Sequence, residues 1–311
     1  MIRTRALVKR FGGCEVLKGV DLDIASGERV AILGLNGAGK TTLIRCILGL
    51  TSFDGSVSVA NCNVDKNGRN ARLHMGYVPQ RAPHFPGTLS EVIEFFAELR
   101  GMDVNKVRKQ LDELDLPLAE HGGKQMGALS GGMLQKSLLA LALAAEVPVL
   151  LLDEPTANLD SRARRDFIES LRAVPAEATI VLATHRLIDV EAVATRLIFL
   201  HEGRLAFDGP IHQLWDGLDD RRTLWIKVPP DLREMARRQL SETGDAPHIL
   251  ATATAIGVRV GRSQMSDVLG YLRDAAIPVM DFWIEAPGLT EVMEKLLQTT
   301  NRSDAGDPSA Q

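Results

Sequence analysis

The sequence predicts an α/β fold built on a parallel sheet, and three stretches carry this prediction. Val30–Leu33, Val149–Leu152 and Ile180–Ala183 are short runs of apolar residues. Such runs are typical of strands that are buried on both faces. Each run is followed at once by a glycine or by polar residues. Because ligands of parallel sheets bind beyond the carboxyl ends of the strands, the three strand ends are candidate site positions.

Composition agrees with a globular protein of about two domains. The chain has 311 residues, of which 45% are hydrophobic and 24% charged. A net charge of −4 gives no basic footprint for nucleic acid. The start, Met1–Arg5, lacks the apolar segment of a signal peptide, and the apolar region Leu138–Leu152 is too short to span a bilayer. We therefore expect a cytoplasmic protein that reaches a membrane only through a partner.

The cysteines point to no special chemistry. Cys14, Cys46 and Cys62 are odd in number and far apart in the sequence. This pattern indicates neither a disulfide framework nor a zinc site, so we expect reduced structural thiols.

Residues 1–30 alternate apolar and polar positions, which predicts an antiparallel β-subdomain ending at Ser26–Glu28. Phe11 precedes Gly12 and Gly13 in a predicted turn. Its ring either stacks on adenine or anchors the core, and the sequence leaves both open.

The segment Gly34–Thr42 joins the strand Val30–Leu33 to an apolar helix. A strand, a glycine-rich turn and a helix form the setting of a phosphate-binding P-loop. The glycines let backbone N–H groups converge on phosphate oxygens, and the helix adds its positive N-terminal end. We expect Lys40 to reach the β- and γ-phosphates of a nucleotide and Thr41 to ligate Mg²⁺. The alternative is a glycine-rich turn that binds no ligand, and Lys40-Thr41-Thr42 at the P-loop spacing argue against it.

The next segment mixes turns, strands and helices. Turns at Asp54-Gly55 and over residues 61–70 flank a strand at Ser56–Val59, and a second strand, Met75–Val78, leads into Gln80. Gln80 closes that strand and is placed to bind a Mg²⁺-bound water, the alternative being an amide that caps a loop. Thr88 and Glu91 have the spacing of a capping box, and residues of about 88–145 are predicted to form a helical insertion.

One further helix start and two further strand ends carry polar groups. Leu129–Lys136 is small and glycine-rich and opens an apolar helix, so it is similar to a second phosphate-binding helix start. Asp153 and Glu154 end the strand Val149–Leu152; Asp153 is placed to hold Mg²⁺ and Glu154 to polarise an attacking water. His185 ends the strand Ile180–Ala183 and is placed to contact a γ-phosphate. The alternatives are solvated carboxylates and a structural histidine.

The end of the chain is patterned differently. A hairpin around Glu202-Gly203 closes the first domain, which we place at residues 1–215. Residues 220–300 alternate predicted strands and helices and form a small α+β accessory domain, with two strand-like runs around Ile256-Gly257 and a last amphipathic helix from Leu289. Residues 301–311 are polar and predicted to be disordered. The accessory domain either stabilises or dimerises the chain, or senses a ligand.

Taken in order, these motifs resemble the ATP-binding subunits of ABC transporters over roughly residues 1–211. The resemblance implies a P-loop ABC-type domain that hydrolyses ATP with Mg²⁺ and drives a transmembrane permease from the inner face of the cell membrane. It also implies a homodimer or pseudo-dimer in which ATP on one P-loop is covered by Ser130 and Gly132 of the other subunit. One departure is Met133, which stands where the family usually has Gln.

The resemblance assigns site residues by position. It gives catalytic roles to Lys40, Gln80, Glu154 and His185, and metal binding to Thr41, Gln80 and Asp153. It gives nucleotide contacts to Phe11, Gly34, Asn36, Gly37, Ala38, Gly39, Lys40, Thr41, Thr42, Ser130, Gly131, Gly132 and the dimer-contact residue Asp160.

A narrower resemblance concerns the cargo. The Leu-Ser-Gly-Gly-Met variant at 129–133 is similar to the ATPase of the transporter that serves copper-site maturation of nitrous-oxide reductase. The chain itself is not expected to bind copper, because His201, His212 and His248 lack ligand spacing. The alternatives are a soluble ABC-type clamp, as in DNA repair or translation, and a regulatory nucleotide-binding module. Clamps resemble fused twin cassettes or carry long coiled coils, whereas this chain has one P-loop and no sustained heptads.

Overall fold

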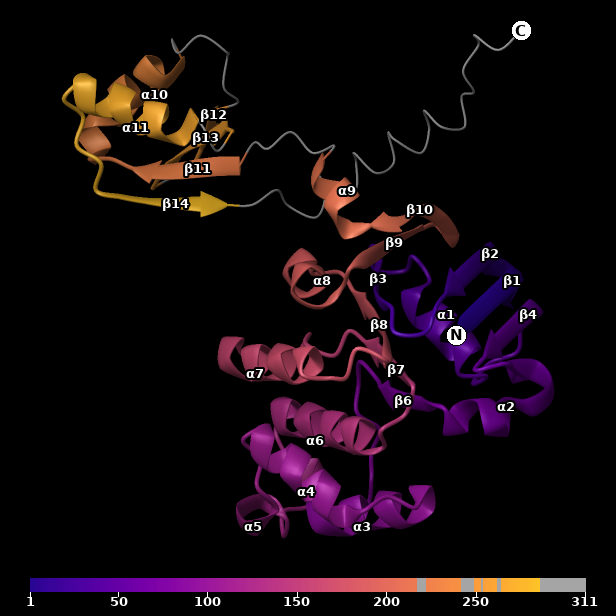
Figure 1. The fold of residues 1–311 in the computed structure, drawn as a ribbon. Coiled ribbons are helices and arrows are strands. Elements are labelled where there is room, and N and C mark those ends of the chain that lie inside the picture. Colours follow the sequence, from indigo (N-terminus) through magenta and orange to yellow (C-terminus); the bar gives the residue numbers. More distant parts are fainter. Residues whose placement is uncertain (217–221, 242–248, 253, 262–263, 286–311) are drawn as a thin grey trace, which may run out of the picture. The chain divides into compact units, whose positions relative to one another are not determined.

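The computed structural model describes residues 1–216, 222–241, 249–252, 254–261 and 264–285. The chain divides into two compact units, Met1–Ile211 and His212–Gln311. The described residues of the first unit form two sheets and those of the second unit form one (Figure 1). The first unit has two apolar cores and the second has one.

A six-stranded sheet forms the centre of the first unit, in the order β10-β9-β3-β8-β7-β6. Five strands are parallel, and only β10 runs antiparallel, to β9. The strands are β3 (Arg29–Leu33), β6 (Met75–Val78), β7 (Val149–Asp153), β8 (Thr179–Thr184), β9 (Arg196–His201) and β10 (Arg204–Pro210). Every residue of β7 and β8 is buried, which explains why these strands read as unbroken apolar runs.

The two faces of this sheet pack into different cores. On β7, Val149 and Leu151 belong to one core, whereas Leu150 and Leu152 belong to the other. The first core is closed by α1 (Lys40–Ile47) and by an antiparallel sheet in the order β2-β1-β4-β5. That sheet consists of β1 (Ile2–Phe11), β2 (Cys14–Ile24), β4 (Asp54–Val59) and β5 (Cys62–Asn63).

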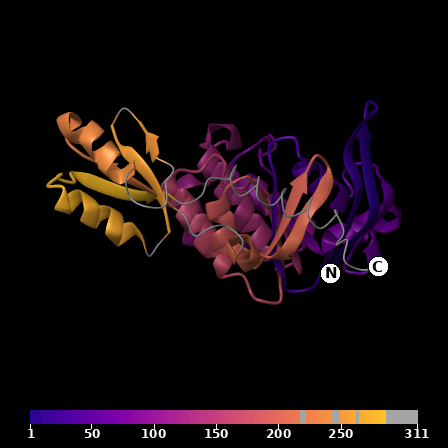
Figure 2. The ribbon, with the colours of Figure 1, turned by 90° about the horizontal axis from the view of Figure 1, so that it is seen from above.

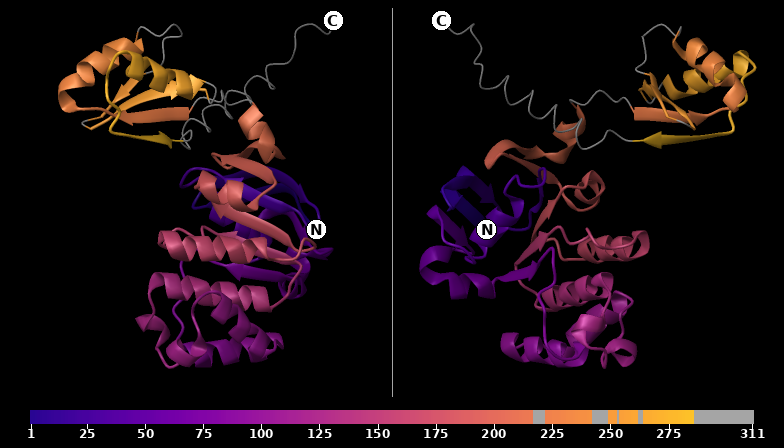
Figure 3. Two further views of the ribbon diagram at one scale, coloured as in Figure 1. Left: turned by 60° about the vertical axis from the view of Figure 1, so that its left-hand side comes forward. Right: turned by 180° about the vertical axis from the view of Figure 1, so that it is seen from behind.

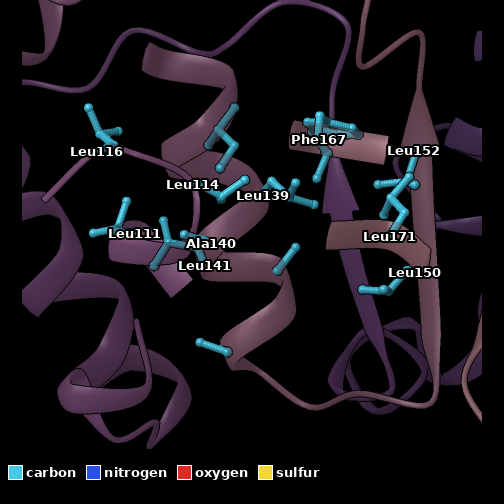
Figure 4. Packing of buried hydrophobic residues seen from close by; sticks show 14 of the residues in the cluster. Leu111, Leu114, Leu116, Leu139, Ala140, Leu141, Leu150, Leu152, Phe167 and Leu171 are labelled. Atoms are coloured by element: carbon cyan, nitrogen blue, oxygen red, sulfur yellow. The ribbon is translucent and has the colours of Figure 1, made fainter. Parts of the chain in front are cut away.

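Helices cover the opposite face of the parallel sheet (Figures 1 and 3). They are α3 (Leu89–Arg100), α4 (Val104–Glu113), α5 (Leu118–His121), the short 3₁₀ helix η1 (Met126–Ala128), α6 (Gly131–Ala144), α7 (Ser161–Arg172) and α8 (Leu187–Val193). Leu139 of α6 and Phe167 of α7 lie in the core shared with Leu150 and Leu152 of β7 (Figure 4). The predicted capping box is present, because the Thr88 and Glu91 side chains each accept from the other's backbone N–H.

One local prediction was wrong. Residues 61–70 were expected to form turns, but most of them belong to α2 (Val64–Leu73). The Asn63 side chain caps this helix by accepting from the backbone N–H of Lys66 at 2.9 Å, and Val64 and Ala71 are buried. Two buried residues in a polar stretch are too few to show a helical period in the sequence.

The second unit begins within α9 (Ile211–Asp216), and the elements after this helix have the order of a split β-α-β motif. Its elements are β11 (Arg222–Lys227), the 3₁₀ helix η2 (Pro230–Leu232), α10 (Arg233–Ser241), β12 (Ile249–Ala251), β13 (Ile256–Val260), α11 (Met265–Asp274) and β14 (Asp281–Glu285). The sheet is antiparallel in the order β12-β13-β11-β14, which is the ferredoxin-like arrangement. Helices α10 and α11 cover one face of it (Figures 1 and 2).

The predicted fold class is confirmed, including the antiparallel subdomain, the helical insertion and the small α+β domain. β12 ends at Ala251 and β13 begins at Ile256, so Ile256-Gly257, where the sequence was expected to turn, lies within a strand. The last predicted helix, from Leu289, and the polar end at 301–311 lie outside the described residues. The exact domain boundaries stay predictions.

Candidate functional site

The loop between β3 and α1 has the geometry of a phosphate cradle. Gly37 and Gly39 adopt left-handed backbone angles, with φ of 84° and 105°, which side chains resist. Gly34 is required for a different reason, because a Cβ there would lie 2.5 Å from the carbonyl oxygen of Leu200. Helix α1 begins at Lys40, so its free N–H groups point toward the loop.

Lys40 is folded back into this loop. Its Nζ donates to the carbonyl oxygens of Gly34 at 2.8 Å and Leu35 at 3.1 Å. It also lies 3.3 Å from Oε1 of Glu154, and the two side chains are only 5% and 7% exposed. The ammonium group is therefore held inside the cradle by partners that phosphate oxygens would replace.

Thr41 and Asp153 come together beside the cradle. Thr41 Oγ1 donates to Asp153 Oδ1 at 3.0 Å, across 112 residues of sequence. Burial raises the pKa of Asp153, and the neighbouring Glu154 carboxylate raises it further. A hydroxyl and a carboxylate are hard oxygen donors of the kind that Mg²⁺ selects, so these residues fit the metal. When bound with a nucleotide, Mg²⁺ neutralises charge on the phosphate oxygens.

Glu154 stands in a strained backbone position directly after β7. Its φ is +46°, in the left-handed region that side-chain-bearing residues rarely adopt. Its backbone N–H donates to the carbonyl oxygen of Ala183 on β8 at 2.8 Å, which holds it in place. Its Oε2 lies 2.7 Å from Nδ1 of His185, the residue that follows β8. The structure therefore brings Lys40, Glu154 and His185 into one chain of contacts.

This arrangement can activate a water at a bound phosphate. If phosphate oxygens occupy the cradle and draw Lys40 toward them, the Glu154 carboxylate loses its ammonium partner and is left to accept from a water. His185 would hold the other carboxylate oxygen and so fix the orientation of Glu154. These roles are predictions drawn from the geometry.

Two predicted residues, Phe11 and Gln80, have no described contact with the Lys40–Glu154–His185 site. Gln80 is exposed directly after β6, and the preceding Pro79 carbonyl accepts from the buried side chain of Gln135 at 3.0 Å. Phe11 ends β1 and is 50% exposed, and the Lys9 Nζ lies 4.5 Å from the centre of its ring. A half-exposed ring does not serve as a core anchor, which leaves adenine stacking as the hypothesis for Phe11.

Ser130, Gly131 and Gly132 form the N-terminal end of α6. Ser130 is the N-cap, and its Oγ accepts from the Met133 N–H at 3.2 Å. Met133 packs against the core of the helical region. α6 and α1 cover opposite faces of the sheet (Figure 1), so within one chain this end does not join the P-loop. That separation is what the expected two-chain sandwich requires.

Among the remaining predicted residues, Asp160 caps a helix, and Asn36, Ala38 and Thr42 lie in the P-loop or in the first turn of α1. Asp160 is the N-cap of α7 and accepts from the N–H groups of Arg162 at 2.9 Å and Ala163 at 2.8 Å. Asn36 is exposed in the loop, and Ala38 is buried beside Gly39. Thr42 is half-buried in the first turn of α1.

A buried network that the sequence did not reveal lies behind Glu154. Asp189 of α8 has no exposed surface. Its Oδ2 accepts from Thr156 Oγ1 at 2.5 Å and its Oδ1 from Arg164 Nε at 2.7 Å. Thr156 follows Glu154 by two residues, Arg164 lies in the helix capped by Asp160, and Asp189 lies in the helix after His185. The network thus joins three elements that carry site residues, and sequence separations of 25 and 33 residues hid it.

Comparison with known proteins agrees with this site. Residues 17–157 match a family model described as ABC transporter. The glutamine transport ATP-binding protein GlnQ of Escherichia coli is 38% identical over 67% of this chain and 91% of its own length. The daunorubicin resistance ATP-binding protein DrrA2 of Streptomyces coeruleorubidus is 30% identical over 95% of this chain and 94% of its own length, so its similarity includes the second unit. A dimeric ATP-binding cassette, solved in a post-hydrolysis state with ADP and phosphate, superposes with a TM-score of 0.62 at 26% identity, over 68% of this chain and 99% of that chain.

Fold and site define an ATP-hydrolysing P-loop protein of the cassette class. The chain belongs to the family of ATP-binding subunits of ABC transporters. It is accordingly an ATPase that uses ATP and Mg²⁺, assembles with a second ATP-binding subunit and pairs with a membrane-spanning permease. In the part of the chain that the structure describes, no helix is long and apolar enough to cross a bilayer.

Proposed function

We propose that ATP hydrolysis at the Lys40–Glu154–His185 site drives a permease, with the chain attached to the cytoplasmic face of the membrane through that partner. The observation that carries this proposal is the pair of contacts to the buried carboxylate of Glu154, at 3.3 Å from Lys40 and 2.7 Å from His185. Phosphate binding would draw Lys40 away from the Glu154 carboxylate and so change these contacts. Ser130 and Gly132 of a second copy would close the site over ATP, because each copy presents them on the sheet face opposite to α1.

We further propose that the transporter serves maturation of a copper enzyme, nitrous-oxide reductase. The support is the sequence Leu-Ser-Gly-Gly-Met at residues 129–133. In this proposal the chain supplies energy, and the permease and its external partners handle the cargo.

The first test is co-purification. The tagged chain, extracted with detergent from membranes of its own cells, should bring down one multi-span protein in a fixed ratio. Addition of that protein in lipid should raise ATP turnover of the purified chain. Retention of all the chain in the membrane-free fraction, with unchanged turnover in lipid, would favour a soluble clamp instead.

The second test concerns cargo. Chromosomal replacement of Glu154 by Gln should yield nitrous-oxide reductase with depleted copper but normal amounts of polypeptide. Replacement of the exposed Glu177 by Gln is the matched control and should leave the copper content unchanged. A fully copper-loaded reductase in the Glu154→Gln strain would rule out this cargo while leaving the ATPase assignment intact.

A further inference from the structure

One face of the C-terminal sheet carries no helix among the described residues. Along β11 and β13 the core residues Leu224, Ile226, Ile256 and Val258 face α10 and α11. The intervening residues therefore point to the other side. We call this side the open face; it consists of Leu250 on β12, Gly257 and Arg259 on β13, Thr223, Trp225 and Lys227 on β11, and Asp281, Trp283 and Glu285 on β14.

An apolar stripe crosses all four strands of the open face. Leu250 pairs with Gly257, Gly257 with Trp225, and Trp225 with Trp283 in the strand register. The two indole rings are nearly parallel, at 14°, with centroids 6.0 Å apart. Leu250 and Trp283 remain 49% and 45% exposed. Large apolar side chains in one exposed row are typical of a surface that binds a partner.

The tryptophans are held in position by their neighbours. A Cβ at Gly257 would lie 3.0 Å from the Trp225 ring, so the glycine lets this ring lie flat across β13. The Trp225 Nε1–H donates to a carboxylate oxygen of Glu285. The stripe is thus a flat and ordered surface, which lowers the entropic cost of binding to it.

Charges on the open face are divided between its two sides. The cationic residues are Arg259 on β13 and Lys227 on β11, and the anionic residues Asp281 and Glu285 are both on β14. A twofold axis parallel to the strands and close to β11 would place β14 of one copy above β11 and β13 of the other. The anionic residues of each copy would then face the cationic residues of the other, and the two apolar stripes would face each other. A uniformly basic or acidic partner would instead meet like charge on one side.

We propose that the open face binds the open face of a second copy of this chain. The contact is isologous, since the same patch is used by both partners. Four strands about 4.8 Å apart and five residues of about 3.4 Å each give a footprint of roughly 300 Å². A stable interface needs roughly 800 Å² per partner, so this contact does not hold two chains together unaided. It forms when the ATP-bound dimer of the proposed function brings two copies to a high effective concentration.

The test uses full-length Glu154→Gln protein, in which ATP should remain bound. The chain has three tryptophans, two of them on the open face, and Trp215→Phe in the same protein makes emission report on that face alone. Addition of ATP and Mg²⁺ should shift the emission to shorter wavelength as light scattering shows dimers. Dimers without an emission shift would overturn the proposal and leave the proposed function standing, and would point to a small ligand or the permease as the occupant. Absence of both signals would remove the ATP-dependent dimer and the proposal together.

Charge reversal tests the pairing itself. Asp281→Lys and Lys227→Asp, each alone, should raise the protein concentration needed for the ATP-dependent dimer several-fold. An equimolar mixture of the two should recover much of the loss, because opposite charges then face each other. Asp274→Lys, an equal charge change at an exposed residue on α11, is the control and should have no effect. If the mixture dimerises no better than either variant alone, the face-to-face contact is wrong.

Discussion

The ammonium nitrogen of Lys40 lies 3.3 Å from Oε1 of Glu154, and both side chains are almost fully buried. His185 contacts the other oxygen of the same carboxylate at 2.7 Å. The carboxylate that the family resemblance assigns to water activation is therefore paired with the lysine assigned to phosphate binding. ATP must separate this pair, so nucleotide binding and activation of Glu154 are coupled in one step.

Glu154→Gln should keep ATP bound and nearly stop hydrolysis. The amide retains the shape of the side chain but cannot accept a proton, and loss of a general base costs roughly 10²–10⁴-fold in rate. ATP affinity should be unchanged or higher, because Lys40 no longer has to leave a carboxylate. Calorimetry and single-turnover hydrolysis measure the two effects, with Glu177→Gln as the control. Wild-type turnover in Glu154→Gln would exclude the proposed role.

Lys40→Ala should lower both stability and ATP affinity, and a second substitution separates the two effects. Alone, it removes the ammonium partner of the buried Glu154 carboxylate and leaves only the contact with His185, which costs roughly 3–5 kcal/mol. Lys40→Ala with Glu154→Gln should recover most of the melting temperature but none of the ATP affinity. Recovery of ATP affinity in the double variant would mean that Lys40 matters through Glu154 alone and does not contact phosphate.

Asp189→Asn tests the network behind the site. The change removes the carboxylate that pairs with Arg164, and the side chain at position 189 has no exposed surface. We expect roughly 3–5 kcal/mol of destabilisation. If Asp189 positions Glu154 and His185, kcat should also fall at temperatures where the variant is fully folded, while the KM for ATP stays close to the wild-type value. The control is Asp115→Asn, which breaks an ion pair with Arg162, a residue of α7 like Arg164. The Arg162 and Asp115 side chains are 77% and 68% exposed, so losing this pair should cost less than about 1 kcal/mol. An unchanged kcat in folded Asp189→Asn protein would make the network purely structural.

Cys46 should be the least reactive of the three thiols. It is fully buried in α1, and burial raises the pKa of its thiol to about 11, so at pH 8 only about one molecule in a thousand carries the reactive thiolate. Cys14 is exposed. Iodoacetamide at pH 8 should label Cys14 first, and Cys46 only after unfolding. Rapid labelling of Cys46 in the folded protein, seen by mass spectrometry, would show that α1 opens from the core.

The sequence predicted the features that depend on local pattern. Runs such as Val149–Leu152 indicated buried strands, and the polar residues after them indicated the site, because parallel strands end at one edge. Helix α2 was missed, since only Val64 and Ala71 are buried in it and a polar surface helix shows no period. The break between β12 and β13 was misplaced, because Gly257 was interpreted as a turn residue. It lies within β13, where its missing side chain makes room for the Trp225 ring.

Contacts between distant residues could not be predicted in this way. His185 contacts Glu154, and Asp189 contacts Thr156, because β7 and β8 are neighbours in the sheet. The sequence alone gives residue types and not the order of the strands. Neither the left-handed backbone of Glu154 nor the ion pair with Lys40 has a local signal, because both are imposed by the packing around them.

Met133→Gln tests the departure from the family pattern at the start of α6. Restoring the usual amide would strengthen the ATP-bound dimer if that side chain contacts nucleotide, by about 0.5–1.5 kcal/mol for one hydrogen bond. The structure favours the opposite outcome, because Met133 packs against the core of the helical region while its N–H serves the Ser130 cap. We therefore expect a lower melting temperature and a dimer no tighter than that of the parent, measured in the Glu154→Gln background by light scattering with ATP.

Ser130→Ala provides the comparison for this test. It removes the N-cap hydroxyl and should cost about 1 kcal/mol of stability, and it should also weaken the ATP-bound dimer if the hydroxyl turns from the Met133 N–H to a phosphate of the second copy. A dimer that forms at several-fold lower concentration in Met133→Gln, with an unchanged melting temperature, would contradict the packing role. If Ser130→Ala then left the dimer unaffected, ATP would be held by the side chain at position 133 and not by the capped end of α6.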